Sequence, residues 1–233
     1  MATSIINTWS LDQAIRLNND GIAHALNGDD DHAIACFSRS LCMFKQLITE
    51  DDGDHVMSDS SARLLPTLLH STSHALPQLR DSGFFLFNRV ISLANTKSIR
   101  PEDNHIYCSI IILNLAVLHH QTAIRGDSAR RRVEALRKAE RFYDMVASIL
   151  ANEHYANSYQ PSGVLTRLAA LNNLAYLRME KGDFGTSFQH FQMLAWLVNL
   201  TQVDQSSLFH EQDLEGMMLN VLMANRQSVA PAA

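Results

Sequence analysis

The sequence predicts an all-α protein built from antiparallel helix hairpins, and three observations support this fold class. A local pattern that opens on asparagine occurs three times, at Asn19, Asn114 and Asn173. Each copy leads across a turn into a second run of apolar residues at helical spacing. Proline, which breaks helix interiors, is rare and falls outside these stretches. The five prolines are at positions 66, 77, 101, 161 and 231.

The first and third copies share their spacing residue for residue, which is the signature of an internal repeat. In the first copy a small residue is followed by a turn glycine, an alanine and a phenylalanine; the third copy has serine in place of the alanine. Such repeats build helical stacks, because each hairpin buries its apolar face against the next. The matching residues are Gly21, Gly28, Ala33 and Phe37 in the first copy, and Ala175, Gly182, Ser187 and Phe191 in the third.

The first hairpin is expected over about residues 10–50. Ser10 with Gln13 forms a capping-box pattern, so the first helix is predicted to begin at Ser10 and to end near Asn27, before Gly28. The aspartates at 29–31 offer an N-cap and favourable negative charge to the second helix. Its apolar residues fall at helical spacing from Ala33 to Ile48.

Residues 51–100 are expected to form an insertion between the first two hairpins. It begins with an acidic stretch over 50–54 and contains a short helical candidate over 63–70. Residues 84–93 are rich in aromatic and β-branched side chains, which favours a short extended segment packed on the helices.

The remaining chain is expected to be helical, and the whole of 1–233 to form one domain. The second hairpin is predicted over about 104–150, as helices 104–124 and 129–150, and the third over 163–200, as helices 163–181 and 184–200. A last amphipathic helix over 207–225 would cap the open end of the stack, followed by a disordered tail over 226–233.

Composition predicts a soluble intracellular protein, which we expect in the cytoplasm. Of the 233 residues, 46% are hydrophobic and 18% charged, enough to fill a packed core. The longest uncharged apolar run, over 108–118, is too short to cross a bilayer, and residues 1–4 lack the features of a secretory signal. Cys36, Cys42 and Cys108 have no metal-ligand spacing, so free thiols are expected.

The repeated residues resemble the tetratricopeptide repeat family, whose unit carries a leucine followed by glycine or alanine, a turn glycine, and then alanine and an aromatic residue. The middle copy matches at Leu115, Ala116, Ala139 and Tyr143 but is stretched by an insertion. In the first copy Asp20 replaces the leucine, and the family's tryptophan is absent from all three copies. The resemblance covers about half of the chain and implies a non-enzymatic scaffold with a concave binding groove.

Asn19, Asn114 and Asn173 share one position in the three copies, and some family members line their groove with such an asparagine ladder. An asparagine side chain both donates to and accepts from the backbone of an extended peptide. The other interpretation is that each asparagine bonds a neighbouring helix or loop inside the stack. The resemblance also places near this face Asn18, Ile22, Val117, His120, Gln121, Asn172, Tyr176, Met179 and Glu180.

A basic stretch stands out against the net charge of −5. Arg130, Arg131 and Arg132 open a predicted helix, where their charge runs against the helix dipole. They are either a solvated face or a grip for an acidic partner segment, including the acidic patch of a second copy. Nucleic acid is not the expected partner, since the protein is acidic and the stretch lacks interleaved aromatic residues.

No enzyme site is predicted, nor any metal or cofactor. His70 and His74 have helical metal-ligand spacing, but the glutamate and third ligand of a zinc site are missing. His119 and His120 point to different sides of a helix, and the former is expected on its packing side. The aspartates at 51, 52 and 54 lack the glycine and glutamate offsets of a calcium loop.

The sequence therefore predicts a protein that binds a peptide or protein segment along its helical groove. Apolar contacts from Ile22, Val117, Tyr176 and Met179 would supply affinity, and the asparagines would fix the register of the peptide backbone. The alternative is a self-associating structural protein whose groove is filled by its own insertion at 84–93. A metal-dependent enzyme is a distant third hypothesis.

Overall fold

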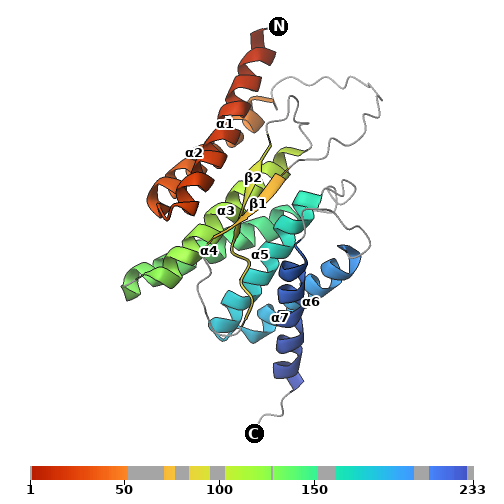
Figure 1. Ribbon diagram of the computed structural model, residues 1–233. Helices are drawn as coiled ribbons and strands as arrows, with labels where there is room; N and C mark the ends of the chain where they lie inside the picture. The colour runs from red at the N-terminus through yellow and green to blue at the C-terminus, as the bar shows by residue number, and fades with distance from the viewer. Residues whose placement is uncertain are drawn as a thin grey trace.

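The fold is mostly helical with one small sheet (Figure 1). The computed structural model describes residues 2–51, 71–76, 84–94, 103–126, 128–151, 161–201 and 210–229. These contain the helices α1 (Ala2–Leu26), α2 (Asp30–Asp51), α3 (Asn104–Arg125), α4 (Ala129–Ile149), α5 (Pro161–Glu180), α6 (Phe184–Thr201) and α7 (Glu211–Val229), and the strands β1 (Ser71–Ala75) and β2 (Arg89–Leu93).

The helices pack as sequential pairs, α1 with α2, α3 with α4 and α5 with α6, and α7 packs on α6. Each pair lies beside the next through contacts of α2 with α3 and of α4 with α5, and α3 also contacts α5. Figure 1 shows α1 and α2 at one end, α3 to α5 in the middle, and α6 and α7 at the other end. The paired helices agree with the predicted hairpins.

The first and third pairs turn through the same backbone structure. Gly28 and Gly182 have φ of 78° and 81°, the left-handed region that a helix-ending glycine adopts without penalty. At each turn two N–H groups reach back to the preceding helix: Gly28 to Ala25 and Asp29 to His24 in one, Gly182 to Met179 and Asp183 to Arg178 in the other. This Schellman geometry satisfies carbonyls that the helix end leaves unpaired.

The aspartate after each turn glycine then begins the second helix. Asp29 Oδ1 accepts from the backbone N–H of His32 at 3.4 Å, and Asp183 Oδ1 from that of Thr186 at 3.3 Å. Both are N-cap contacts, which supply an acceptor to an otherwise unpaired amide. The identical spacing seen in sequence therefore encodes one complete turn, used twice.

Small residues let the helices of a pair approach closely. Ala116 and Ala175 are fully buried at the corresponding position of α3 and α5. At Gly21 a Cβ atom would lie 2.8 Å from the ring of Phe37, which is itself fully buried. The tight contact between α1 and α2 depends on the missing side chain.

The central helix of the protein is α3. It is the one described helix long and apolar enough to cross a membrane, and 94% of its most apolar stretch is buried inside the protein. All but a few of its residues pack against neighbours, with Ile110, Ile111 and Leu113 completely enclosed. This burial on all sides explains why α3 carries little polar surface.

Several predicted boundaries are wrong. Helix α1 begins at Ala2, so Ser10 lies inside the helix and not at its N-cap; no proline or glycine interrupts residues 2–9. Helix α7 begins at Glu211 and runs to Val229, so the predicted tail is helical over 226–229. The helix expected over 63–70 lies outside the described residues, as does most of the acidic stretch.

The predicted extended segment is present. Its second half forms β2, which pairs antiparallel with β1 in the register Ser73↔Ile91. Residues 84–88 precede it and belong to no helix or strand. In Figure 1 this segment runs across α3 and α5 towards α7.

We expect Gly21→Ala to destabilise the protein by about 1–3 kcal/mol, because the new methyl group would overlap the enclosed Phe37 ring. Urea unfolding monitored by circular dichroism measures this. The matched control is Gly185→Ala in α6, where a Cβ atom meets nothing within 4 Å. There, stability should stay the same or rise by up to about 1 kcal/mol. Equal effects at the two sites would contradict the close-packing argument.

Candidate functional site

The predicted asparagine ladder binds a segment of the protein's own chain. Asn19 on α1 donates from Nδ2 to the carbonyl of Leu93 at 2.8 Å and accepts the Leu93 N–H at 3.0 Å. Asn114 on α3 makes the same two bonds to Ile91, at 2.9 and 2.8 Å. Each asparagine thus clamps both backbone groups of one residue.

The ladder continues on the next helices. Asn173 on α5 donates to the Phe87 carbonyl at 2.8 Å and accepts its N–H at 2.9 Å. Asn220 on α7 clamps Phe85 in the same way, at 2.7 and 2.8 Å. The sequence prediction missed Asn220, which has Leu222 where the other copies have glycine or alanine two residues later. The available signal was that Asn220 is an asparagine within the last predicted amphipathic helix, as the other three rungs are asparagines within predicted helices.

Asparagine suits this role because one side chain carries a donor and an acceptor on the same amide group. In an extended chain the N–H and C=O of one residue point to the same edge, so both meet one asparagine. The opposite orientation of the amide would set donor against donor. The two hydrogen bonds to one residue therefore fix each asparagine amide in a single orientation.

Two further asparagines predicted near this face join neighbouring rungs. Asn18 accepts from Asn114 Nδ2 at 3.0 Å and donates to the Ile91 carbonyl at 3.3 Å. Asn172 accepts from Asn220 Nδ2 at 2.8 Å and donates to the Phe85 carbonyl at 3.1 Å. Both are fully buried. The rungs are therefore linked in two pairs, Asn19 with Asn114 through Asn18 and Asn173 with Asn220 through Asn172, and the members of each pair support one another.

The opposite backbone edge of residues 88–93 faces β1 and Leu76. Because residues 91 and 93 turn their backbone groups towards the asparagines, those of 88, 90 and 92 point the other way. The register pairs Thr72 with Ser92 and His74 with Val90. Just beyond the sheet, Leu76 N–H donates to the Asn88 carbonyl at 2.9 Å, and Asn88 Nδ2 donates to the Leu76 carbonyl at 2.9 Å.

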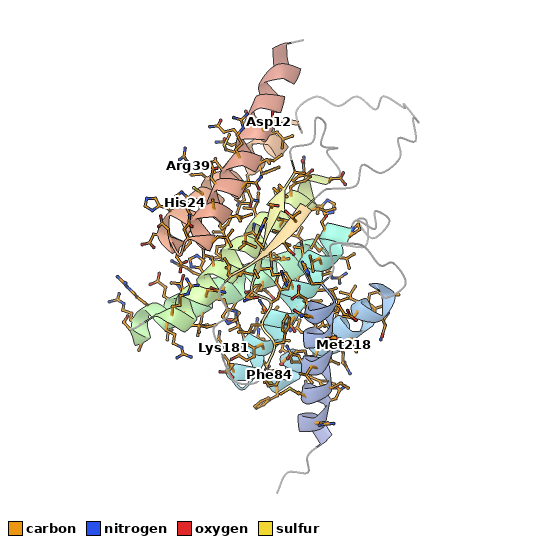
Figure 2. All side chains as sticks on the ribbon, viewed as in Figure 1. Asp12, His24, Arg39, Phe84, Lys181 and Met218 are labelled. Carbon is orange, nitrogen blue, oxygen red and sulfur yellow. The ribbon has the colours of Figure 1, made fainter. Side chains whose placement is uncertain are left out.

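The segment is part of the hydrophobic core. Phe87, Val90, Ile91 and Leu93 are each at most 1% exposed. At the other end, the Phe84 ring stacks on Phe191 and lies tilted against Tyr176. Its side chain lies near α6 and α7 in Figure 2, far from Asp12 and Arg39 on α1 and α2. The groove is therefore filled along its length from α7 to α1.

Most of the other residues predicted to line the groove are buried. Met179 is partly buried and Glu180 is exposed, at the end of α5. The remaining predicted groove residues are buried, namely Ile22, Val117, His120, Gln121 and Tyr176. The groove wall is thus an interior surface in this conformation.

A buried polar chain leads from the ladder to His120. Asn173 Nδ2 donates to the hydroxyl of Tyr143 at 2.9 Å, and that hydroxyl lies 3.4 Å from His120 Nδ1. Burial lowers the pKa of His120 to about 4, so its imidazole is neutral at pH 7. A neutral ring can accept a hydrogen bond from the Tyr143 hydroxyl at Nδ1. His119 is also buried, stacks on Phe142, and has a pKa lowered to about 4, chiefly by burial.

One charged pair lies beside the segment. Arg89 Nε is 2.7 Å from Asp213 Oδ2, and the two side chains are 16% and 9% exposed. Burial raises the pKa of Asp213, while the nearby Arg89 cation acts in the opposite direction. Asp213 lies in the first turn of α7, where negative charge is favourable.

The predicted basic patch is exposed at the first turn of α4. Ser128 caps this helix by accepting the Arg131 N–H at 3.2 Å, and Arg130, Arg131 and Arg132 form no ion pair with a described residue. Close to this patch, Arg125 at the end of α3 pairs with Asp30 in the first turn of α2, with Arg125 Nη1 3.3 Å from Asp30 Oδ1. Glu134, one turn further along α4, is the nearby acidic group on which Arg130 acts electrostatically.

The described residues contain no group of three metal-ligating side chains. His74 lies in β1, and His70 is outside the described part of the chain. The three cysteines are free: Cys108 is buried, Cys36 half-buried and Cys42 exposed. Burial raises the pKa of Cys108 to about 11, so its thiol is protonated and a poor nucleophile.

Comparison with known proteins found no matching protein-family model, no matching curated protein and no matching solved structure. The hydrogen-bond geometry described above therefore carries the functional argument.

We expect Asn114→Ala to destabilise the protein by about 2–5 kcal/mol, because it leaves the buried Ile91 N–H without a partner and the Ile91 carbonyl with only the longer bond from Asn18. The matched change is Asn19→Ala, at a half-buried rung where water can replace the side chain, so its effect should be smaller. Urea unfolding of both variants measures the difference. If Asn114→Ala cost no more than Asn19→Ala, the buried clamp would not contribute as described.

We also expect stability to fall as pH decreases from about 6.5 to 4. In the unfolded chain a histidine takes up its proton near pH 6.5, whereas folded His120 resists protonation until about pH 4. The contribution is therefore complete above pH 6.5 and is lost below it, by up to about 3 kcal/mol for one such histidine. Unfolding free energies across this range should show a shallower pH dependence in His120→Gln than in wild type. Parallel curves would exclude this role for His120.

Proposed function

We propose that this protein is a non-enzymatic interaction module of tetratricopeptide-like helix hairpins, whose groove binds an extended protein or peptide segment. The observation that carries the proposal is the ladder of four asparagines, each clamping the N–H and C=O of one residue. Support for the tetratricopeptide-like description comes from the matching turns at Gly28 and Gly182 and from the buried Phe37 and Phe191.

The ladder's hydrogen bonds go to main-chain groups, which every amino acid except proline offers. Recognition of this kind fixes the conformation and register of a segment and depends less on its sequence, as in other modes that bind an extended strand. Apolar contacts would then set the affinity.

In the isolated chain, residues 84–93 are the internal ligand of the groove, and any partner must replace them. Four fully buried side chains of this segment contribute about 6–12 kcal/mol, comparable with the net stability of a whole domain. A tethered segment also has an effective concentration in the millimolar range. A foreign peptide therefore binds well only when it offers equivalent contacts or when the internal segment is weakened.

A second candidate function is self-association, and the identity of the occupant favours it. Residues 84–93 of a second copy would make the same eight ladder hydrogen bonds and bury the same side chains as the chain's own segment. Exchange between copies would then be opposed mainly because a segment from another copy lacks the high effective concentration of a segment in the same chain. This candidate is the structural building block predicted as the alternative from sequence.

Binding of a labelled peptide with the sequence of residues 84–93 tests the first proposal. We expect full-length Ile91→Ser, whose internal ligand is weakened, to bind this peptide about tenfold or more tightly than wild type. The destabilised control is Val146→Ser on α4, which removes buried apolar surface and leaves the segment intact. Fluorescence anisotropy measures binding, and equal weak binding by all three proteins would reject a recognising groove.

Methylation of single backbone nitrogens in the labelled peptide supplies a second control, because it tests whether the asparagines recognise the peptide backbone. Methylation of the peptide nitrogen of Phe87 or Ile91 removes an N–H that an asparagine accepts, and binding should be lost. Methylation at Leu86, whose N–H points to the opposite edge, should be tolerated.

Molar mass in solution tests the second proposal. Light scattering after size-exclusion chromatography should give a mass that rises from monomer to dimer with protein concentration. Ile91→Ser weakens the segment equally in the monomer and in the exchanged dimer, so it should speed the exchange between them and leave their ratio at equilibrium nearly unchanged. A constant monomer mass would reject exchange and leave the peptide-binding proposal in place.

A further inference from the structure

The groove meets one residue of its internal ligand through a side chain and not through the backbone. Residues 85, 87, 89, 91 and 93 share one backbone edge, and asparagines clamp four of them. The fifth, Arg89, lies in the four-residue interval between the rungs of α5 and α3. Its guanidinium pairs with Asp213 at 2.7 Å.

The buried carboxylate of Asp213 is energetically unfavourable unless a cation lies beside it. Its side chain is 9% exposed, and burial raises its pKa above the usual range. Of the groups that lower this pKa electrostatically, Arg89 has the largest effect, and His210, an exposed residue just before α7, has a smaller one. A segment lacking a cation at this position would leave a carboxylate desolvated and unpaired.

There is room for an aromatic side chain at Phe85, the residue clamped by Asn220, because α7 has a glycine beside it. Gly216 lies one helical turn before Asn220, and a Cβ atom there would lie 2.3 Å from the ring of Phe85. The ring therefore occupies the space that a side chain at 216 would fill. Among the described glycines, only Gly216 would bring a Cβ atom against a side chain of the segment, so this feature also distinguishes the two possible directions of a bound segment.

We infer that the groove selects extended segments carrying arginine at the position of Arg89, with Asp213 as the residue that sets this preference. The ligand class is a peptide with aromatic residues four and two positions before the arginine and aliphatic residues two and four positions after it. Its N-terminal aromatic residue lies against Gly216 on α7, and its C-terminal end reaches Asn19 on α1. This inference rests on the proposed peptide-binding function and names its ligand.

The test uses the full-length chain with Arg89→Gln, in which the internal ligand no longer neutralises Asp213. Three labelled peptides are compared, each spanning residues 84–93 with arginine, glutamine or glutamate at position 89. The arginine peptide should bind at least about tenfold more tightly than the glutamine peptide, and the glutamate peptide should bind least. Far-UV circular dichroism and a melting curve establish that the receptor is folded.

The matched receptor carries both Arg89→Gln and Asp213→Asn, and it should bind the arginine and glutamine peptides equally. Should Arg89→Gln fail to fold, Arg89→Lys keeps the charge and loses the planar fork, and it should show the same order of peptides.

The outcomes separate the two proposals. Equal binding of the three peptides to Arg89→Gln would overturn the arginine preference and leave a groove that recognises backbone. A preference that persists in the double variant would overturn the role of Asp213. No binding by any receptor, including Ile91→Ser, would reject the proposed function itself.

Discussion

An extended segment inside a helical protein has backbone groups that the surrounding helices cannot pair. Helices satisfy their own N–H and C=O groups internally, so they offer an enclosed strand no backbone partners. Residues 84–93 have two such edges. Strand β1 pairs with one edge over residues 89–93, and the asparagine side chains pair with the other edge. Because each buried unpaired group costs about 1–3 kcal/mol, the segment can be part of the core only with both sets of partners.

This requirement constrains how the helices are spaced. A residue presents its N–H and C=O to the ladder only if it lies an even number of positions from the other clamped residues. The clamped positions are 85, 87, 91 and 93, so every interval is even. The asparagines come from α7, α5, α3 and α1 in that order, and the hairpin turns at Gly28 and Gly182 hold two of these helices against their partners.

Because residues 84–93 fill the groove, it is part of the protein interior and not an open binding surface. In this conformation its wall is an interior surface, and the polar groups behind it, from Asn18 to Tyr143 and His120, are paired with one another or with the segment. A binding function must therefore operate by replacement of one extended segment with another. The residue that makes such replacement selective is Asp213, because its carboxylate needs a cation that the backbone does not supply.

The sequence by itself determined the helices, their pairing and three of the four rungs. Periodicity and punctuation are local, so the turn at Gly28 with its cap at Asp29, and the recurrence of asparagine at 19, 114 and 173, could be read from neighbouring residues. Composition alone also indicated that 84–93 is extended. The start of α1 was mispredicted because a capping-box pattern at Ser10 does not stop a helix whose preceding residues are also compatible with one.

Only the tertiary structure decided what the ladder holds. The contacts of Asn114 with Ile91 and of Asn220 with Phe85 join residues 23 and 135 positions apart, and no local pattern encodes such a meeting. Asn220 was missed because its helix has no second helix of a predicted hairpin to mark it as a repeat. The pairing of Arg89 with Asp213 is likewise set by where a strand and a distant helix end come together. Local chemistry specified groups able to bind an extended backbone, and long-range packing determined which backbone they bind.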